Sequence, residues 1–166
     1  MDLFNSLSNK STSNNSIVNQ IDFGKTEALN VQGNFSLRES FGCGGSIKSN
    51  EGDPEILLHI IFKQKISIVG ICIESNDNSL APKQIQMFSG KSNIDFSDIG
   101  SVNPTEILDF IDGKTIPLKK AKYKNIDGLS VFLSNEDAKY LKINNIILLG
   151  EEGETTDMSQ MKNTNP

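Results

Sequence analysis

The sequence predicts an all-β protein, a jelly-roll β-sandwich of antiparallel strands with flexible N- and C-terminal tails. Three observations lead to this fold class. Apolar residues gather in short runs of strand length. Turn-forming residues separate these runs, and no long segment has the helical period. The connection between residues 88 and 119 is too long for a simple hairpin, as a Greek-key or jelly-roll crossing requires.

The chain of 166 residues has a length typical of one domain with tails. Residues 1–20 are rich in Asn and Ser and offer little to bury, so they are predicted to form a flexible arm. Residues 21–158 are assigned to the sandwich, and residues 159–166 to a second flexible tail. Few apolar residues occur from 17 to 35, which predicts loops or one short strand there.

The stretch from Ile56 to Phe96 organises the predicted sheet. Residues 56–62 and 66–73 are apolar at both side-chain parities, which is typical of strands covered on both faces. Residues 83–88 alternate between polar and apolar side chains, as in a half-exposed strand. The sequence therefore predicts two central strands followed by an outer one.

Four further segments complete the prediction. Residues 105–110 form either a single helical turn or a strand. Lysines alternate with other residues from 119 to 126, which indicates an edge strand protected against pairing with another chain. Asp127-Gly128 is predicted as the tight turn that leads into a strand at 129–133. The last strand extends from 140 to 149.

Two glycine-containing segments resemble phosphate-binding loops without completing the motif. The segment at 41–45 would need a third glycine where Ile47 stands, and no helix is predicted after it. Gly90-Lys91-Ser92 would need a first glycine at Ile85, inside a predicted strand. The sequence therefore predicts a turn at 41–45 and no nucleotide site at either segment.

Composition excludes several classes of partner. With 16 basic and 21 acidic residues the net charge is -5, and no basic stripe is present, so no nucleic acid is expected. No apolar segment approaches the roughly 18 to 20 residues that span a bilayer, and no signal-peptide pattern follows Met1. A soluble chain without membrane contact is expected. Cys43 and Cys72 are too few and too far apart for a disulfide framework or a metal pair.

The residues that could carry chemistry are sparse. His59 shares a strand parity with Leu57 and Ile61, which is typical of a packed side chain rather than a metal ligand or catalytic base. Any Ser/His/Asp set would need this single histidine. The oxygen-rich segment 74–78 could coordinate calcium, although an ordinary loop is the favoured interpretation. The sequence predicts no catalytic residue, no cofactor and no metal site, and hence no enzyme.

Several short motifs occur in order between Lys48 and Met158. They are Ser49-Asn50 followed by Glu55-Ile56-Leu57-Leu58, Pro82-Lys83-Gln84-Ile85-Gln86-Met87-Phe88, Ile94-Asp95-Phe96, Pro104-Thr105, the run 119–125, Lys142-Ile143 through Leu149-Gly150, and Thr155-Thr156-Asp157-Met158. Together they resemble the PITH domain family, the proteasome-interacting thioredoxin domain. In that family a Pro-Lys and a strand lead through an Asp-Phe pair to a Pro-Thr, with a Thr-Asn-Met near the C-terminus.

The resemblance implies a galactose-binding-like jelly roll without catalysis of its own. It implies a protein-interaction module that docks onto the 26S proteasome regulatory particle, as in thioredoxin-like proteasome-associated proteins, in the cytoplasm and also the nucleus. The partners would be regulatory-particle subunits, and a thioredoxin domain would belong to the full-length chain. No C-x-x-C motif occurs in the sequence given. A monomer is expected.

The candidate partner-binding residues follow from the family motifs and from the composition of interfaces. Interfaces favour aromatic residues and Met over Lys and Glu, so Asp95 and Phe96, and Thr156 and Met158, are the candidates. Phe96 could instead be a core residue that closes one end of the sandwich. The alternative function is a carbohydrate- or small-ligand-binding jelly-roll module. A hydrolytic or redox enzyme ranks third.

Overall fold

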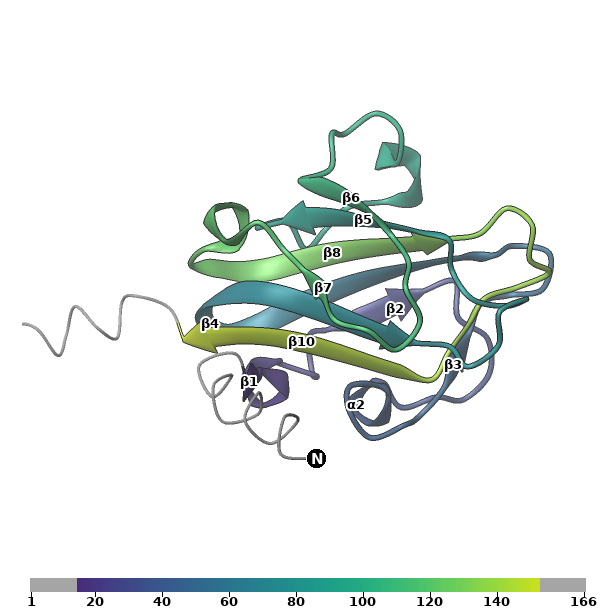
Figure 1. Cartoon of the computed structure of the whole chain (residues 1–166), viewed down its shortest axis with the longest axis horizontal. Coiled ribbons are helices and arrows are strands. Elements are labelled where there is room, and N and C mark those ends of the chain that lie inside the picture. Colours follow the sequence, from purple (N-terminus) through teal and green to yellow (C-terminus); the bar gives the residue numbers. More distant parts are fainter. Residues whose placement is uncertain (1–14, 153–166) are drawn as a thin grey trace, which may run out of the picture.

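A single strand of 20 residues, β4 (Glu55–Glu74), runs through both layers of the sandwich. The computed structural model describes residues 15–152 (Figure 1). The first half of β4 pairs with β2 (Glu27–Leu29) on one side and β8 (Ile126–Ser134) on the other. Its second half pairs with β10 (Asn145–Glu152) and β7 (Ile116–Pro117). The fold is therefore two antiparallel layers that share one strand.

The remaining elements extend these layers. The layer around the first half of β4 has the order β2-β4-β8-β5-β6, with β5 at Gln84–Ser89 and β6 at Glu106–Asp109. On the other layer β1 (Asn15–Ser16) pairs with β10. A separate small sheet joins β3 (Ile47–Lys48) to β9 (Lys142–Ile143). The short helices are η2 (Val18–Gln20), α2 (Leu37–Ser40), η3 (Phe96–Asp98) and η4 (Lys120–Tyr123).

The sequence predicts two strands where the structure has one. The polar segment 63–65 is exposed and interrupts the apolar pattern, but the chain stays extended through it. The register with β8 shifts between Ile61 and Ile66 at this point. A strand that bends at a polar segment can leave one layer and enter the other, because its neighbours change there. The prediction that these residues are central and covered on both faces is confirmed.

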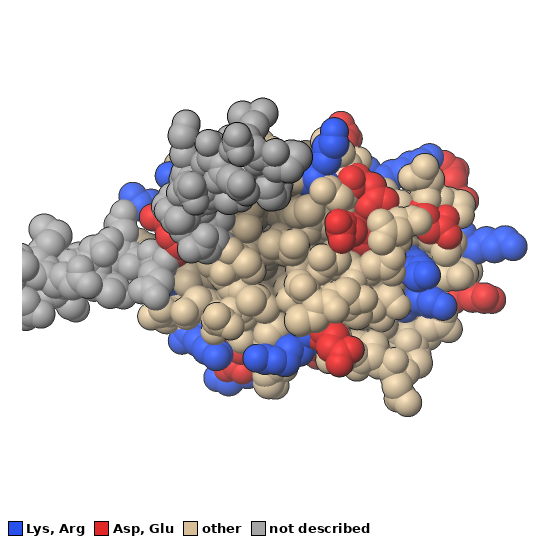
Figure 2. Space-filling model, turned by 60° about the horizontal axis from the view of Figure 1, so that its bottom comes forward, with Lys and Arg blue, Asp and Glu red and all other residues tan. Residues whose placement is uncertain are grey.

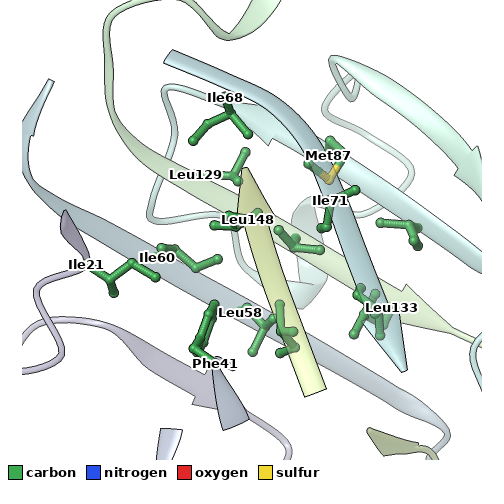
Figure 3. Packing of buried hydrophobic residues seen from close by; sticks show 14 of the residues in the cluster. Ile21, Phe41, Leu58, Ile60, Ile68, Ile71, Met87, Leu129, Leu133 and Leu148 are labelled. Atoms are coloured by element: carbon green, nitrogen blue, oxygen red, sulfur yellow. The ribbon is translucent and has the colours of Figure 1, made fainter. Parts of the chain in front are cut away.

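The main core lies between the two layers (Figure 3). Side chains from both halves of β4 meet there, including Leu58 and Ile60 from the first half and Ile68 and Ile71 from the second. A second, smaller cluster covers the outer face of the five-stranded layer. Its buried members are Leu57, Phe88, Ile94 and Phe132. In the first half of β4 the even-numbered apolar residues lie in the main core and Leu57 lies in the smaller cluster, whereas in the second half residues of both parities lie in the main core.

The predicted alternation of residues 83–88 is confirmed in β5, but the predicted outer position is wrong, because β5 lies between β8 and β6. Ile85 and Met87 are buried, whereas Gln84 is exposed and Gln86 is half-buried. The segment 105–110, for which the sequence allowed either a helical turn or a strand, contains the edge strand β6.

The predicted edge strand at 119–126 is wrong. Residues 120–123 form the 3-10 helix η4, and Tyr123 is fully buried in the main core. The Tyr123 hydroxyl donates a hydrogen bond to Glu106 Oε1 (2.8 Å). A turn of helix directs this one large side chain inward while it leaves the neighbouring lysines in solvent, which the alternating pattern alone does not reveal.

The predicted tight turn at Asp127-Gly128 is also wrong. Both residues lie within β8, where Gly128 pairs with Ile61. A Cβ atom at position 128 would lie 2.9 Å from the Ser92 Cβ atom. The glycine therefore permits a close approach of another segment instead of reversing the chain.

Within the predicted arm at 1–20, the structure describes residues 15–20. These residues pack on the sandwich, because β1 pairs with β10 and Ile17 is buried. The predicted tail at 159–166 lies outside the described residues. In the described part of the chain, no helix has the length and apolar character needed to cross a membrane.

Candidate functional site

Residues 91–104, most of the connection between β5 and β6, lie over the outer face of the five-stranded layer and are called the flap. Its apolar residues Ile94, Ile99 and Val102 pack in the cluster formed by Leu57, Phe88 and Phe132. The flap is thus attached to the sheet by apolar burial, as well as by its covalent ends.

Two buried polar side chains of the sheet hold the flap in place. The Nε2 atom of His59 lies 2.6 Å from the carbonyl oxygen of Ile94, and Ser130 Oγ donates to the Lys91 carbonyl (2.7 Å). The other ring nitrogen of His59, Nδ1, lies 3.0 Å from Glu27 Oε2. His59 is a packed and hydrogen-bonded side chain, as the sequence predicts.

The candidate residues Asp95 and Phe96 lie on the flap. The Asp95 N–H donates to Asp98 Oδ2 (2.9 Å), and the Asp98 N–H donates to the Asp95 carbonyl (2.9 Å), which closes the turn η3. Phe96 is 36% exposed, and its ring packs edge-on against Phe132 with centroids 6.2 Å apart. Phe96 is therefore neither a free side chain nor a core residue, because one side rests on the sheet and the other faces solvent.

An exposed isoleucine extends this apolar surface. Ile107 on β6 is 56% exposed and pairs with Gln86, which in turn pairs with Phe132 on β8. Directly paired residues point to the same face of a sheet, so Ile107 lies on the face that Phe96 covers in part. We call the surface formed by Phe96, Ile107, Gln86 and Phe132 the outer patch. Thr156 and Met158, the other two candidates, lie outside the described residues.

Ile107 is not among the residues that the sequence motifs indicate. Residues 106–109 do not alternate in polarity, and the one usable signal is that Ile107 shares its parity with Asp109, a residue expected to face solvent. An apolar residue on the solvent-facing parity of an edge strand is an indication of an interaction surface.

The segment 74–78, considered for calcium, directs its groups to the protein itself. The Asp112 carboxylate accepts hydrogen bonds from the N–H groups of Ser75 (2.9 Å) and Asn76 (3.1 Å). Ser75 Oγ donates to the Lys142 carbonyl (2.5 Å). Within residues 15–152, no group of three or more His, Cys, Asp or Glu side chains is placed to hold a metal ion. The contacts fit an ordinary structural loop.

Burial changes the acidity of two side chains. It raises the pKa of the Tyr123 hydroxyl well above its ordinary value, and the adjacent Glu106 acts in the same direction. It also raises the pKa of the Cys72 thiol, with smaller contributions from Glu74 and Asp112. A thiol with a raised pKa is a poor nucleophile, so Cys72 is a structural residue. Cys43, the other cysteine, is exposed.

The charged side chains are dispersed on the face that Figure 2 displays. Lys and Arg are interspersed with Asp and Glu around a broad uncharged surface, without a continuous basic stripe on that face. Binding to a nucleic acid backbone depends on a continuous basic surface of this kind.

Solved structures with the same fold come from carbohydrate-active and related bacterial proteins. The two CBM32 domains of ZmpB from Clostridium perfringens, solved with GalNAc, are 11% identical, with a TM-score of 0.61 over 95% of this chain and 42% of theirs. The F5/8 type C domain of a Bacteroides fragilis protein is 9% identical, with a TM-score of 0.56 over 86% of this chain and 99% of that one. These likenesses confirm the galactose-binding-like jelly roll.

A sequence relative and a family model give a closer relationship. A PITH domain-containing protein of Schizosaccharomyces pombe is 27% identical over 97 residues, which are 55% of this chain and 47% of the relative. The chain therefore spans about half the length of that protein. The PITH domain model matches residues 8–166, nearly the whole sequence. The resemblance of the short motifs is confirmed, and the chain belongs to the PITH domain family.

Proposed function

We propose that this chain is a non-catalytic interaction module that docks onto the regulatory particle of the 26S proteasome through the outer patch. The supporting observation is an exposed apolar surface, centred on Phe96 and Ile107, in a chain of the PITH domain family. The name of the family associates it with the proteasome, and the family motif Asp95-Phe96 lies at this surface.

The outer patch has the composition of a protein interface. Phe96 and Ile107 provide an apolar centre, while Gln84, Asp95 and Asp109 provide a polar rim. Energetically important residues of interfaces are commonly apolar or aromatic side chains surrounded by such a rim. The outer patch lies on a hydrogen-bonded sheet and on a flap that is attached to it. Binding of a partner would therefore cost this chain little conformational entropy.

Capture from a cell extract tests this proposal. Tagged wild-type chain is incubated with extract at low salt, and bound regulatory-particle subunits are identified by mass spectrometry. The substitution Ile107→Lys places a charge in the apolar centre, and we expect it to reduce capture at least about tenfold. Because Ile107 is exposed, the cost to the free energy of unfolding should stay within about 0.5 kcal/mol.

A matched control uses the other exposed phenylalanine. Phe35 is 39% exposed and lies outside the outer patch, so Phe35→Lys should leave capture of the regulatory particle unchanged. Equal capture by wild type and Ile107→Lys would exclude the outer patch as the docking surface. Failure of the wild-type chain to retain regulatory-particle subunits would exclude the partner itself.

The second candidate function is carbohydrate binding, which the GalNAc complex of the CBM32 domains favours. A hollow of about 340 Å³ lined by Ser16, Asn19, Arg38 and Phe41, among others, offers hydroxyl, amide and guanidinium groups next to apolar surface. A glycan array with calcium present tests this alternative. Specific retention of one glycan, lost in Arg38→Ala, would favour it over proteasome docking.

The proposal also concerns the full-length protein. A thioredoxin domain on the full-length protein is part of the proposal, because the family name suggests that domain. We place the complex in the cytoplasm and the nucleus, and the isolated module as a monomer. Fractionation of cells that express the full-length protein tests the location.

A further inference from the structure

A second surface lies where β4 passes from one layer to the other. A hollow of about 420 Å³ there is lined by Lys25, Ile61, Phe62, Lys63, Gln64, Lys65, Ser92 and Asp127. This hollow is called the lysine groove. It is distinct from the outer patch, although the flap contributes Ser92 to one and Phe96 to the other.

The lysine groove concentrates positive charge on a chain of net charge -5. Lys25, Lys63 and Lys65 are all exposed. Within residues 15–152, basic and acidic side chains at ion-pair distance are Lys83 with Asp137 and, through a ring nitrogen, His59 with Glu27, and neither contact involves the groove. Asp127 is the single carboxylate in the lining. Three ammonium groups that face solvent around one hollow attract an acidic ligand.

The extended backbone of β4 continues along the groove. In the ladder with β8, Ile61 pairs with Gly128 and Ile66 pairs with Ile126, and Glu152, the last described residue of β10, pairs with Ile66. Residues 63–65 between them have no register partner in the described part of the chain, although they remain extended. An extended peptide can add to such a segment through main-chain hydrogen bonds.

We propose that the lysine groove binds an extended acidic peptide segment of a partner protein. The carboxylates of the segment pair with Lys25, Lys63 and Lys65, and its backbone pairs with residues 63–65. A peptide fits better than a nucleic acid, because a regularly charged phosphate backbone would meet the Asp127 carboxylate in the lining. This inference does not depend on the outer patch.

Fluorescence anisotropy with a synthetic peptide tests the charge. The probe is a fluorescein-labelled decapeptide of alternating glutamate and valine, titrated with the chain at 20 mM salt. We expect saturable binding that weakens at 0.5 M salt, where exposed ion pairs are screened. The double variant Lys63→Gln/Lys65→Gln should weaken binding about tenfold, as the loss of two exposed ion pairs at low salt implies.

The matched control removes the same charge elsewhere. Lys48 on β3 and Lys139, which precedes β9, are exposed and do not line the groove, so Lys48→Gln/Lys139→Gln should bind within twofold of wild type. Equal weakening in both double variants would mean that only net charge matters and would overturn the proposal.

A second measurement tests the backbone pairing and the identity of the ligand. The same decapeptide with every main-chain amide N-methylated cannot donate main-chain hydrogen bonds, so it should bind about tenfold more weakly, and amide chemical shifts of residues 63–65 should move with the unmodified peptide alone. Tighter binding of a ten-nucleotide oligothymidine would overturn the proposal in favour of nucleic acid. Tighter binding of a peptide with the sequence of residues 153–166 would overturn it in favour of an internal acidic segment.

The Ile107→Lys variant should bind the decapeptide normally, so failure of either proposal leaves the other testable.

Discussion

Tyr123 illustrates how one residue determines the local structure of this domain. Tyr123 is the largest fully buried side chain among the described residues, and it lies in the main core. Its hydroxyl donates a hydrogen bond to Glu106 on β6. A buried hydroxyl needs a hydrogen-bond partner, and the half-buried Glu106 carboxylate provides one. The lysines around Tyr123 suggest a surface strand, but the burial of this ring decides the local conformation.

The raised pKa of Tyr123 predicts a loss of stability in alkali. Above pH of about 10 the tyrosine of the unfolded chain loses its proton while the folded chain retains it, so the free energy of unfolding falls. Tyr123→Phe should lower that free energy by about 1 kcal/mol at pH 7 and show a smaller decline above pH 10. Urea unfolding followed by circular dichroism at several pH values measures both effects. Parallel decline in the two proteins would contradict this assignment.

At the scale of elements, the sequence predicts those features that depend on the periodicity of side chains within one strand. The alternation in β5 and the two-faced burial of β4 follow directly from residue types, because each depends on side chains within one strand. Gly128 was misinterpreted because the segment that needs its missing side chain, at Ser92, is 36 residues away. In the candidate surface, Phe96 belongs to a family motif that the sequence shows, whereas the place of Ile107 beside it follows from the register of β6 on β5.

Gly150 offers a test of the contact between β10 and β4. A Cβ atom there would overlap with the carbonyl oxygen of Ser67, at the point where the register of the two strands shifts. Gly150→Ala should therefore cost at least about 2 kcal/mol of unfolding free energy, because backbone must move to admit the methyl group. Its exposed neighbour on the same strand provides the control, and Glu151→Ala should change stability by less than about 0.5 kcal/mol in the same denaturation assay.

At the scale of the whole molecule, the sharing of β4 makes each layer depend on the other. The main core draws on both halves of that strand, so neither layer retains its buried surface if the other unfolds. Such coupling is the physical basis of a cooperative transition.

We therefore expect two-state unfolding. Urea midpoints measured by far-UV circular dichroism and by tyrosine fluorescence should coincide, because Tyr123 lies in the core that both layers build. Two separated midpoints would show that the layers unfold independently. The strand that they share would then couple their unfolding only weakly. A core variant such as Leu148→Ala, which should lose about 2 to 5 kcal/mol, should shift both midpoints together.

The pairing of β1 with β10 brings Asn15 opposite Gly150. Residues 15 and 152, the two ends of the described chain, therefore lie at one rim of the sandwich. Such a module can be inserted into a surface loop of a host protein with short linkers, since its entry and exit points are already adjacent. Mechanical tension applied through those two points would act on the short β1–β10 ladder first, opening it one residue pair at a time before it reaches the interior strands.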